Sequence, residues 1–153
     1  MPVIVIGADA PGGREIVQSL LGREGEVRVF VTDPAVARRL RDLGAKVAMG
    51  DVSDGSHIGA AALAAFSAVV ITAAAIDERK RSFASTGSDV LAAWAEALTD
   101  VSIHRIIAVG DPGEDAGALL RAAAPEYASV NPTGRSPGDI AIEVAALDDA
   151  ATL

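Results

Sequence analysis

The sequence predicts an α/β fold built on a doubly wound parallel sheet of about five strands. Three observations predict this fold. Apolar runs of strand length alternate with helix-like segments, the runs are continuous rather than alternating in polarity, and a glycine-rich turn follows the first run directly. The chain has 153 residues, half of them apolar, which suits one domain spanning residues 1–153.

Five apolar runs predict strands that are buried on both faces, because none of them shows the polar alternation of a strand with one face in water. Short connections and helix patterns separate them, as in βαβ units. The runs are "VIVI" (3–6), "VRVFV" (27–31), "KVAM" (46–49), "AVVIT" (68–72) and "RIIAV" (105–109).

Helix patterns fill the intervals between these runs. Asp33 followed by Pro34 predicts the start of the second helix, and Gly44 predicts its end. Ser53 or Asp54 is the expected cap of the third helix, and Ser88 or Asp89 that of the fourth. Apolar residues on a single helical face support the first, second and fourth helices, and they are Ile16, Val17, Leu20 and Leu21, then Val36, Leu40 and Leu43, then Leu91, Trp94, Ala95 and Leu98.

The pattern weakens after Val109, which predicts a shortened C-terminal region. Residues 110–138 hold Gly and Pro around one short helical piece and are expected to form a long loop region, either functional or mobile. Residues 139–151 predict a C-terminal helix capped by Asp139.

Composition excludes several classes of function. A net charge of −8 disfavours binding to nucleic acids and to anionic membranes, and no apolar run reaches the length of a membrane span. The chain has no Cys and only two His, so we expect no metal site and no thiol chemistry. A cytoplasmic protein is the expectation.

The turn "GADAPGG" places Gly7, Ala10 and Gly13 at the spacing G-x-x-A-x-x-G between a predicted strand and a predicted helix. Such positions provide a tight turn, close approach of the backbone to a phosphate, and close packing of helix on sheet. The amides at the start of the helix then favour an anion. The loop predicts dinucleotide binding, with a merely structural turn as the alternative.

Three motifs in this order resemble those of the short-chain dehydrogenase/reductase superfamily, in particular its atypical branch of NmrA-like NAD(P)-binding Rossmann proteins. They are "GADAPGG", "VTDPAVARRL" and "GDVSD", and the resemblance covers residues 1 to about 110. It implies a Rossmann-like sheet and a nicotinamide dinucleotide as cofactor.

The resemblance also implies a set of cofactor-binding residues. Asp51 and Val52 would edge the adenine, although Asp51 can equally be a loop residue that caps the next helix. Ala73 and Ala74, at the end of the fourth predicted strand, would lie beside the nicotinamide ribose. The loop that faces the pyrophosphate consists of Gly7, Ala8, Asp9, Ala10, Pro11, Gly12 and Gly13.

The choice between NAD and NADP depends on the end of the second strand. Relatives that take NADP often have Arg immediately before Asp-Pro, and this chain has Thr32 there. Asp33 lies close to where an acidic residue accepts from a ribose 2′-hydroxyl, which favours NAD mildly. Arg38 and Arg39 are expected to face solvent, but they can also reach a phosphate, so the choice stays open.

The catalytic residues usual in this superfamily are a Tyr-x-x-x-Lys pair and a nearby Ser. The only tyrosine is Tyr127, and Asn131 occupies the lysine position, so nothing there lowers the tyrosine pKa. Asp111 follows the fifth strand, where the serine is expected. Asp111 and Tyr127 are the catalytic candidates, although Asp111 before Pro112 is also typical of a turn.

Two functions remain open, beside a structural subunit that keeps the fold without a ligand, a reading that Ala10 in the glycine motif would allow. The first is an NAD(P)-dependent oxidoreductase that acts on a small carbonyl or enone without the usual Tyr-Lys pair. The second is a non-catalytic, NmrA-like nucleotide sensor that regulates a protein partner. In either case a homo-oligomer or a partner subunit can complete the site.

Overall fold

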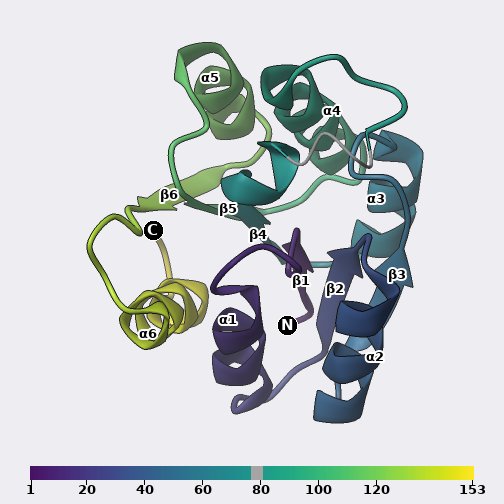
Figure 1. Cartoon of the computed structure of the whole chain (residues 1–153). Coiled ribbons are helices and arrows are strands. Elements are labelled where there is room, and N and C mark those ends of the chain that lie inside the picture. Colours follow the sequence, from purple (N-terminus) through teal and green to yellow (C-terminus); the bar gives the residue numbers. More distant parts are fainter. Residues whose placement is uncertain (77–80) are drawn as a thin grey trace.

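The computed structural model describes residues 1–76 and 81–153, which form one six-stranded parallel sheet with helices on both faces (Figure 1). The strands lie in the order β3-β2-β1-β4-β5-β6. This is the strand order of a Rossmann fold, as the sequence predicts. The strands are β1 (Val3–Ile6), β2 (Val27–Val31), β3 (Lys46–Met49), β4 (Ser67–Ile71), β5 (Arg105–Val109) and β6 (Glu126–Val130).

The strand order reverses at β1, which pairs with β2 on one side and with β4 on the other. Val5, for example, lies between Val29 and Val69. In open parallel sheets, ligands bind beyond the carboxyl ends of the strands at such a reversal. The loop that follows β1 therefore occupies the position in this fold that is best suited to a ligand.

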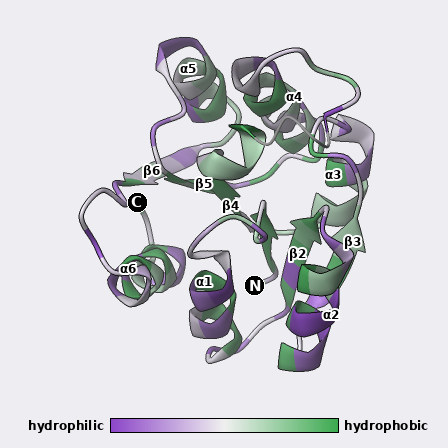
Figure 2. Cartoon of the chain, in the orientation of Figure 1, coloured by the Kyte–Doolittle hydropathy of each residue, from purple (hydrophilic) through white to green (hydrophobic). Residues whose placement is uncertain are grey.

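Three helices cover each face of the sheet (Figure 1). One layer consists of α1 (Gly13–Leu21), α2 (Pro34–Leu43) and α6 (Pro137–Asp149), and the other of α3 (Gly55–Ala62), α4 (Gly87–Asp100) and α5 (Glu114–Ala122). The strands at the centre of the sheet are hydrophobic along their length, whereas the helices are polar on their outer sides (Figure 2).

Burial on both faces explains the continuous apolar runs. Val3 and Val5 belong to the core under α1, α2 and α6, whereas Ile4 and Ile6 belong to the core under α3, α4 and α5. Successive residues of a strand point to opposite faces, so a strand between two helical layers must be apolar at every position.

Four of the five predicted strands have the predicted bounds. The fourth begins one residue earlier, and Thr72 starts a short 3-10 helix, η1 (Thr72–Ile76), instead of ending the strand. Asp33 and Asp54 cap α2 and α3 as expected. The prediction of Ser88 or Asp89 as the cap of α4 is wrong. The N-cap is Thr86, whose hydroxyl accepts a hydrogen bond from the amide of Asp89.

The region after Val109 differs most from the prediction. Residues 110–138, expected to be a long loop region around one short helical piece, contain the helix α5 and also a sixth strand, β6, which the sequence does not predict. The last helix spans residues 137–149 rather than 139–151. Its cap is Ser136, whose hydroxyl accepts from the amide of Asp139, and Pro137 occupies the first turn. No helix of residues 1–76 and 81–153 combines the length and apolar composition that a membrane crossing requires.

Candidate nucleotide-binding site

The glycine loop leaves β1 at the carboxyl edge of the sheet and enters α1 through two tight turns. The amide of Ala10 donates to the carbonyl of Gly7, and the amide of Gly13 donates to the carbonyl of Ala10. Gly7 and Gly12 both have φ of 85°, a conformation that side chains rarely adopt. The backbone of this loop therefore depends on glycine at both positions.

Two glycines also meet steric requirements. A Cβ at Gly13 would lie 2.1 Å from the carbonyl oxygen of Ala8, and a Cβ at Gly7 would lie 2.4 Å from the Cβ of Ala74. Gly12 has no atom within 4 Å of such a position, so it faces open space. The absence of a side chain at Gly7 and Gly13 lets the loop pack closely against η1 and against its own backbone. At Gly12 the loop faces open space.

The start of α1 has no side-chain cap, because the N-cap residue is Gly12. By contrast, side chains cap α2, α3, α4 and α6, and the capping residues are Asp33, Asp54, Thr86 and Ser136. Amides at an uncapped helix start are available to an anion, and the helix dipole favours a negative charge there. The loop thus fits the pyrophosphate of a dinucleotide.

Ala10, which replaces the middle glycine of the motif, is compatible with this role. Its φ is not in the positive range that requires glycine. Its side chain is partly buried and packs against both hydrophobic cores, so the methyl group is directed into the protein. Pro11 is exposed and has no amide hydrogen. The amides that can donate to a ligand here are therefore those at the start of α1.

Asp9 connects the loop to the end of β2. Its Oδ2 accepts hydrogen bonds from the amide of Thr32 at 2.9 Å, from the Thr32 hydroxyl at 2.9 Å and from the amide of Asp33 at 3.2 Å. Thr32 is buried, and the carboxylate of Asp33 accepts from the amide of Ala35 as the cap of α2. The sequence places Asp9 in the loop but does not predict this contact.

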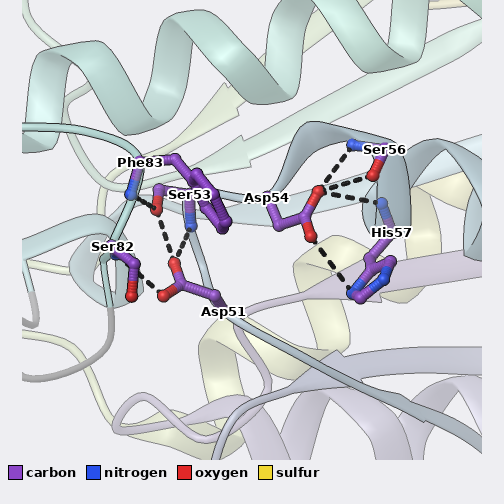
Figure 3. A network of polar contacts seen from close by, with 7 residues as sticks. All are labelled: Asp51, Ser53, Asp54, Ser56, His57, Ser82 and Phe83. Atoms are coloured by element: carbon purple, nitrogen blue, oxygen red, sulfur yellow. Dashed lines mark hydrogen bonds and ion pairs between the residues drawn. The ribbon is translucent and has the colours of Figure 1, made fainter.

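Asp51 lies in a polar network after β3 (Figure 3). Its Oδ1 accepts from the amide of Ser53 at 2.8 Å and from the Ser53 hydroxyl, and its Oδ2 accepts from the amide of Ser82 at 2.8 Å. Burial raises the pKa of Asp51, but these hydrogen bonds outweigh burial and lower the pKa to about 2. Asp51 does not cap α3, since Asp54 does.

The residue after Asp51 faces the core. The side chain of Val52 is buried, and its carbonyl oxygen accepts a hydrogen bond of 2.5 Å from the indole nitrogen of Trp94. Ser53 continues the network of Figure 3, because its hydroxyl accepts from the amide of Phe83 at 2.9 Å. Residues 51–53 therefore connect the end of β3 to α4 and to the segment before it.

Ala73 and Ala74 lie in η1, next to the glycine loop. Ala74 is buried against Gly7, and its small side chain permits the close approach of η1 to the loop. Ala73 is exposed. The hydroxyl of the preceding residue, Thr72, donates to the carbonyl of Val109 at 3.0 Å, which joins the ends of β4 and β5.

A cavity of about 360 Å³ opens where β5 and β6 end. Both catalytic candidates, Asp111 and Tyr127, lie in its wall. The remaining residues that line it are Gly110, Pro112, Arg121, Ser129, Val130, Asn131 and Thr133. The residues that line this cavity lie outside the three motifs, and β6, which forms one wall of it, is not predicted from the sequence.

Neither candidate has the surroundings of the usual proton relay. Asp111 accepts from the amide of Gly113 at 2.8 Å, in a turn. The Tyr127 hydroxyl is buried without a hydrogen-bond partner among the described residues, and burial raises its pKa. The nearby Arg121, 5.3 Å from the ring centre, opposes this rise, whereas Asp111 adds to it. Asn131 accepts from the amide of Thr133 and carries no positive charge.

The amino-acid sequence matches a known protein family. Residues 7–132 match the protein family described as NAD(P)H-binding. This match includes the glycine loop, the end of β2 and the Asp51 network. No curated protein matches the chain.

Solved structures show the same fold at low sequence identity. The anaerobillin reductase ChuY from Escherichia coli O157:H7 has a TM-score of 0.68 and 18% identity over 99% of this chain and 92% of its own. The triphenylmethane reductase of Citrobacter sp., complexed with NADP(H), has a TM-score of 0.78 and 15% identity over 97% of this chain and 66% of its own.

A third similar structure is the NADPH-dependent quinone oxidoreductase QOR2 of Escherichia coli, in complex with NADPH. Its TM-score is 0.79, with 14% identity over 97% of this chain and 65% of its own. The chain therefore spans most of ChuY but about two thirds of the other two proteins. The match over residues 7–132 and the shared fold confirm the resemblance to NmrA-like NAD(P)-binding Rossmann proteins, and the chain belongs to the NAD(P)H-binding family.

Proposed function

We propose that this protein is an NAD(P)H-dependent reductase of conjugated acceptors such as quinones and enones. The observation that carries the proposal is the loop from Gly7 to Gly13, which lies where the strand order reverses and ends at an uncapped helix start. A cavity at the ends of β5 and β6 offers space for a small substrate on the same edge of the sheet.

The described residues provide no proton relay of the usual Tyr-Lys type, which supports a conjugated acceptor over a simple ketone. A bound reduced nicotinamide supplies hydride. When hydride adds to a quinone or an enone, the resulting anion is delocalised and can take its proton from water, whereas a simple alkoxide needs a positioned acid. The pKa of Tyr127 is raised, and Asn131 stands where a lysine would lower it.

The names of the similar structures agree with this class of reaction. They describe a reductase linked to triphenylmethane dyes and a quinone oxidoreductase, and such dyes and quinones are both conjugated compounds. We expect the protein to use NADH in preference to NADPH, because the end of β2 carries no Arg that could bind a 2′-phosphate.

The test follows the absorbance of NADH and NADPH with two panels of acceptors, one of quinones and enones and one of simple aldehydes and ketones. We expect turnover with the first panel. Gly13→Asp should abolish it, because a charged side chain would lie against both the Ala8 carbonyl and the pyrophosphate. Equal or greater turnover with simple ketones would contradict the proposal.

The second candidate is a nucleotide sensor that regulates a protein partner. Two observations favour it, because neither residue is equipped for proton transfer. The buried hydroxyl of Tyr127 has no hydrogen-bond partner among the described residues, and Asn131 is uncharged. The sensor binds NAD(P)H without oxidising it in the presence of any acceptor. Binding without turnover on both panels would therefore favour this second function.

A further inference from the structure

We propose that Asp9 is the residue that selects NADH over NADPH, by placing a negative charge where the adenosine ribose binds. This inference rests on the proposed use of a nicotinamide dinucleotide. It assigns the selection to the glycine loop rather than to Asp33, the acidic residue at the end of β2.

The position of Asp9 at the end of β2 supports this role. In dinucleotide-binding Rossmann folds, the end of the second strand receives the ribose of the adenosine half, and a 2′-phosphate requires a cation there. Asp9 reaches this place from the loop, since its Oδ2 is held by the amides of Thr32 and Asp33 and by the Thr32 hydroxyl. Three hydrogen bonds fix the carboxylate at the end of β2.

The second oxygen of this carboxylate is available to a ligand. All three hydrogen bonds reach Oδ2, and Oδ1 has no hydrogen-bond partner in the described part of the chain. Oδ1 can therefore accept from a ribose 2′-hydroxyl, whereas a 2′-phosphate would meet a like charge at short range.

Asp33 is less suited to this task. Its Oδ1 accepts from the amide of Ala35 at 2.8 Å, so the side chain is turned toward the start of α2. Arg38 and Arg39 are the nearest cations of α2 in sequence, and both are exposed. Among the described residues, Asp9 is thus the carboxylate that hydrogen bonds hold against the end of β2, whereas the carboxylate of Asp33 is turned to the start of α2.

The test measures binding, so that it does not depend on turnover. The dissociation constants of NADH, NADPH, ADP-ribose and 2′-phospho-ADP-ribose are measured by calorimetry for the parent and for Asp9→Asn. The parent should bind the forms without the 2′-phosphate about tenfold or more tightly than those with it. Asp9→Asn keeps an oxygen that can accept from Thr32 and Asp33, so it should fold normally and bring the ratio close to one.

Asp33→Asn is the matched control, because asparagine also caps a helix and the variant removes one charge from the same region. It should change the ratio less than Asp9→Asn does. Tighter binding of NADPH by the parent, an unchanged ratio in Asp9→Asn, or a larger change in Asp33→Asn would overturn the role of Asp9. The proposed NAD(P)H-dependent reduction of conjugated acceptors would still stand. Failure to bind any of the four ligands would overturn both.

Discussion

Asp51 joins two segments that lie far apart in the sequence. Its carboxylate contacts Ser53 on one side and the amide of Ser82 on the other, across 31 residues. Such hydrogen bonds to the ionised form stabilise the folded state only while the group is charged. The segment before α4 is therefore held to the end of β3 in a pH-dependent way.

The lowered pKa of Asp51 predicts a specific change in stability with pH. The folded pKa of about 2 is below its usual 3.8, so the stabilisation is complete above about pH 4 and is lost between about pH 4 and pH 2. Asp51→Asn should be less stable than the parent at pH 7, and the difference in the free energy of unfolding should shrink across this range in urea titrations.

Asp42→Asn is the control for this measurement, because it removes one exposed carboxylate from α2 without touching the network. A difference between the parent and Asp51→Asn that stays constant down to pH 2 would contradict the account of Asp51.

For single residues, the sequence predicts where a residue lies in the fold better than it predicts the residues with which its side chain forms hydrogen bonds. The spacing of Gly7, Ala10 and Gly13 predicts the loop, because each position has a local steric task. The contacts of Asp9 with Thr32 and of Asp51 with Ser82 depend on how distant segments approach one another. An acidic residue inside a glycine loop is the one signal that points to the contact of Asp9.

The edge of the sheet opposite the glycine loop carries a buried arginine. Arg105, at the start of β5, is 1% exposed, and it contacts the Glu126 carboxylate at 2.6 Å. It also donates to the carbonyls of Leu147 and Asp148 at the end of α6. One side chain thus joins β5, β6 and the C-terminus of the last helix.

Removing this arginine should weaken the attachment of α6. Arg105→Met leaves the Glu126 charge and two helix-end carbonyls without their partner, which predicts a loss of about 3 kcal/mol or more in the free energy of unfolding. Urea titration measures the loss, and hydrogen exchange should show faster opening of α6.

The matched control is Arg28→Met. Arg28 also pairs with a glutamate, Glu26, and donates to two carbonyls, but its side chain is 23% exposed. Solvent can replace much of what it contributes, so we expect a smaller loss. An equal loss in the two variants would show that burial of Arg105 is not what makes it important.

Elements buried on both faces are the ones that the sequence predicts well. The strands β1, β2 and β5 stand out as continuous apolar runs, whereas β6 is only partly buried and has the mixed sequence "EYASV". The other edge strand, β3, is predicted with its exact bounds, although it is only partly buried and not buried on both faces as its sequence suggests. The mixed polarity of β6 is therefore what hides this strand from the sequence. The start of α6 was misplaced because both Ser136 and Asp139 are good caps, and only the structure distinguishes them.

At the scale of the molecule, the strand order brings the glycine loop, the end of β2, η1 and the cavity at β5 and β6 to one edge of the sheet. All four lie within or next to residues 7–132, the part that matches the NAD(P)H-binding family. Two similar reductases extend beyond this chain by about a third of their length. The site proposed for this protein is therefore a nucleotide site with a small polar cavity beside it.

If the glycine loop binds a nicotinamide dinucleotide, NAD⁺, NADH, NADP⁺ or NADPH should stabilise the protein against thermal unfolding. A ligand that binds only the folded state must stabilise it, and at a hundredfold excess over the dissociation constant the melting temperature should rise by about 5 to 10 °C. We predict such a rise with at least one of the four forms and its loss in Gly13→Asp. No rise with any form at millimolar concentration would contradict it.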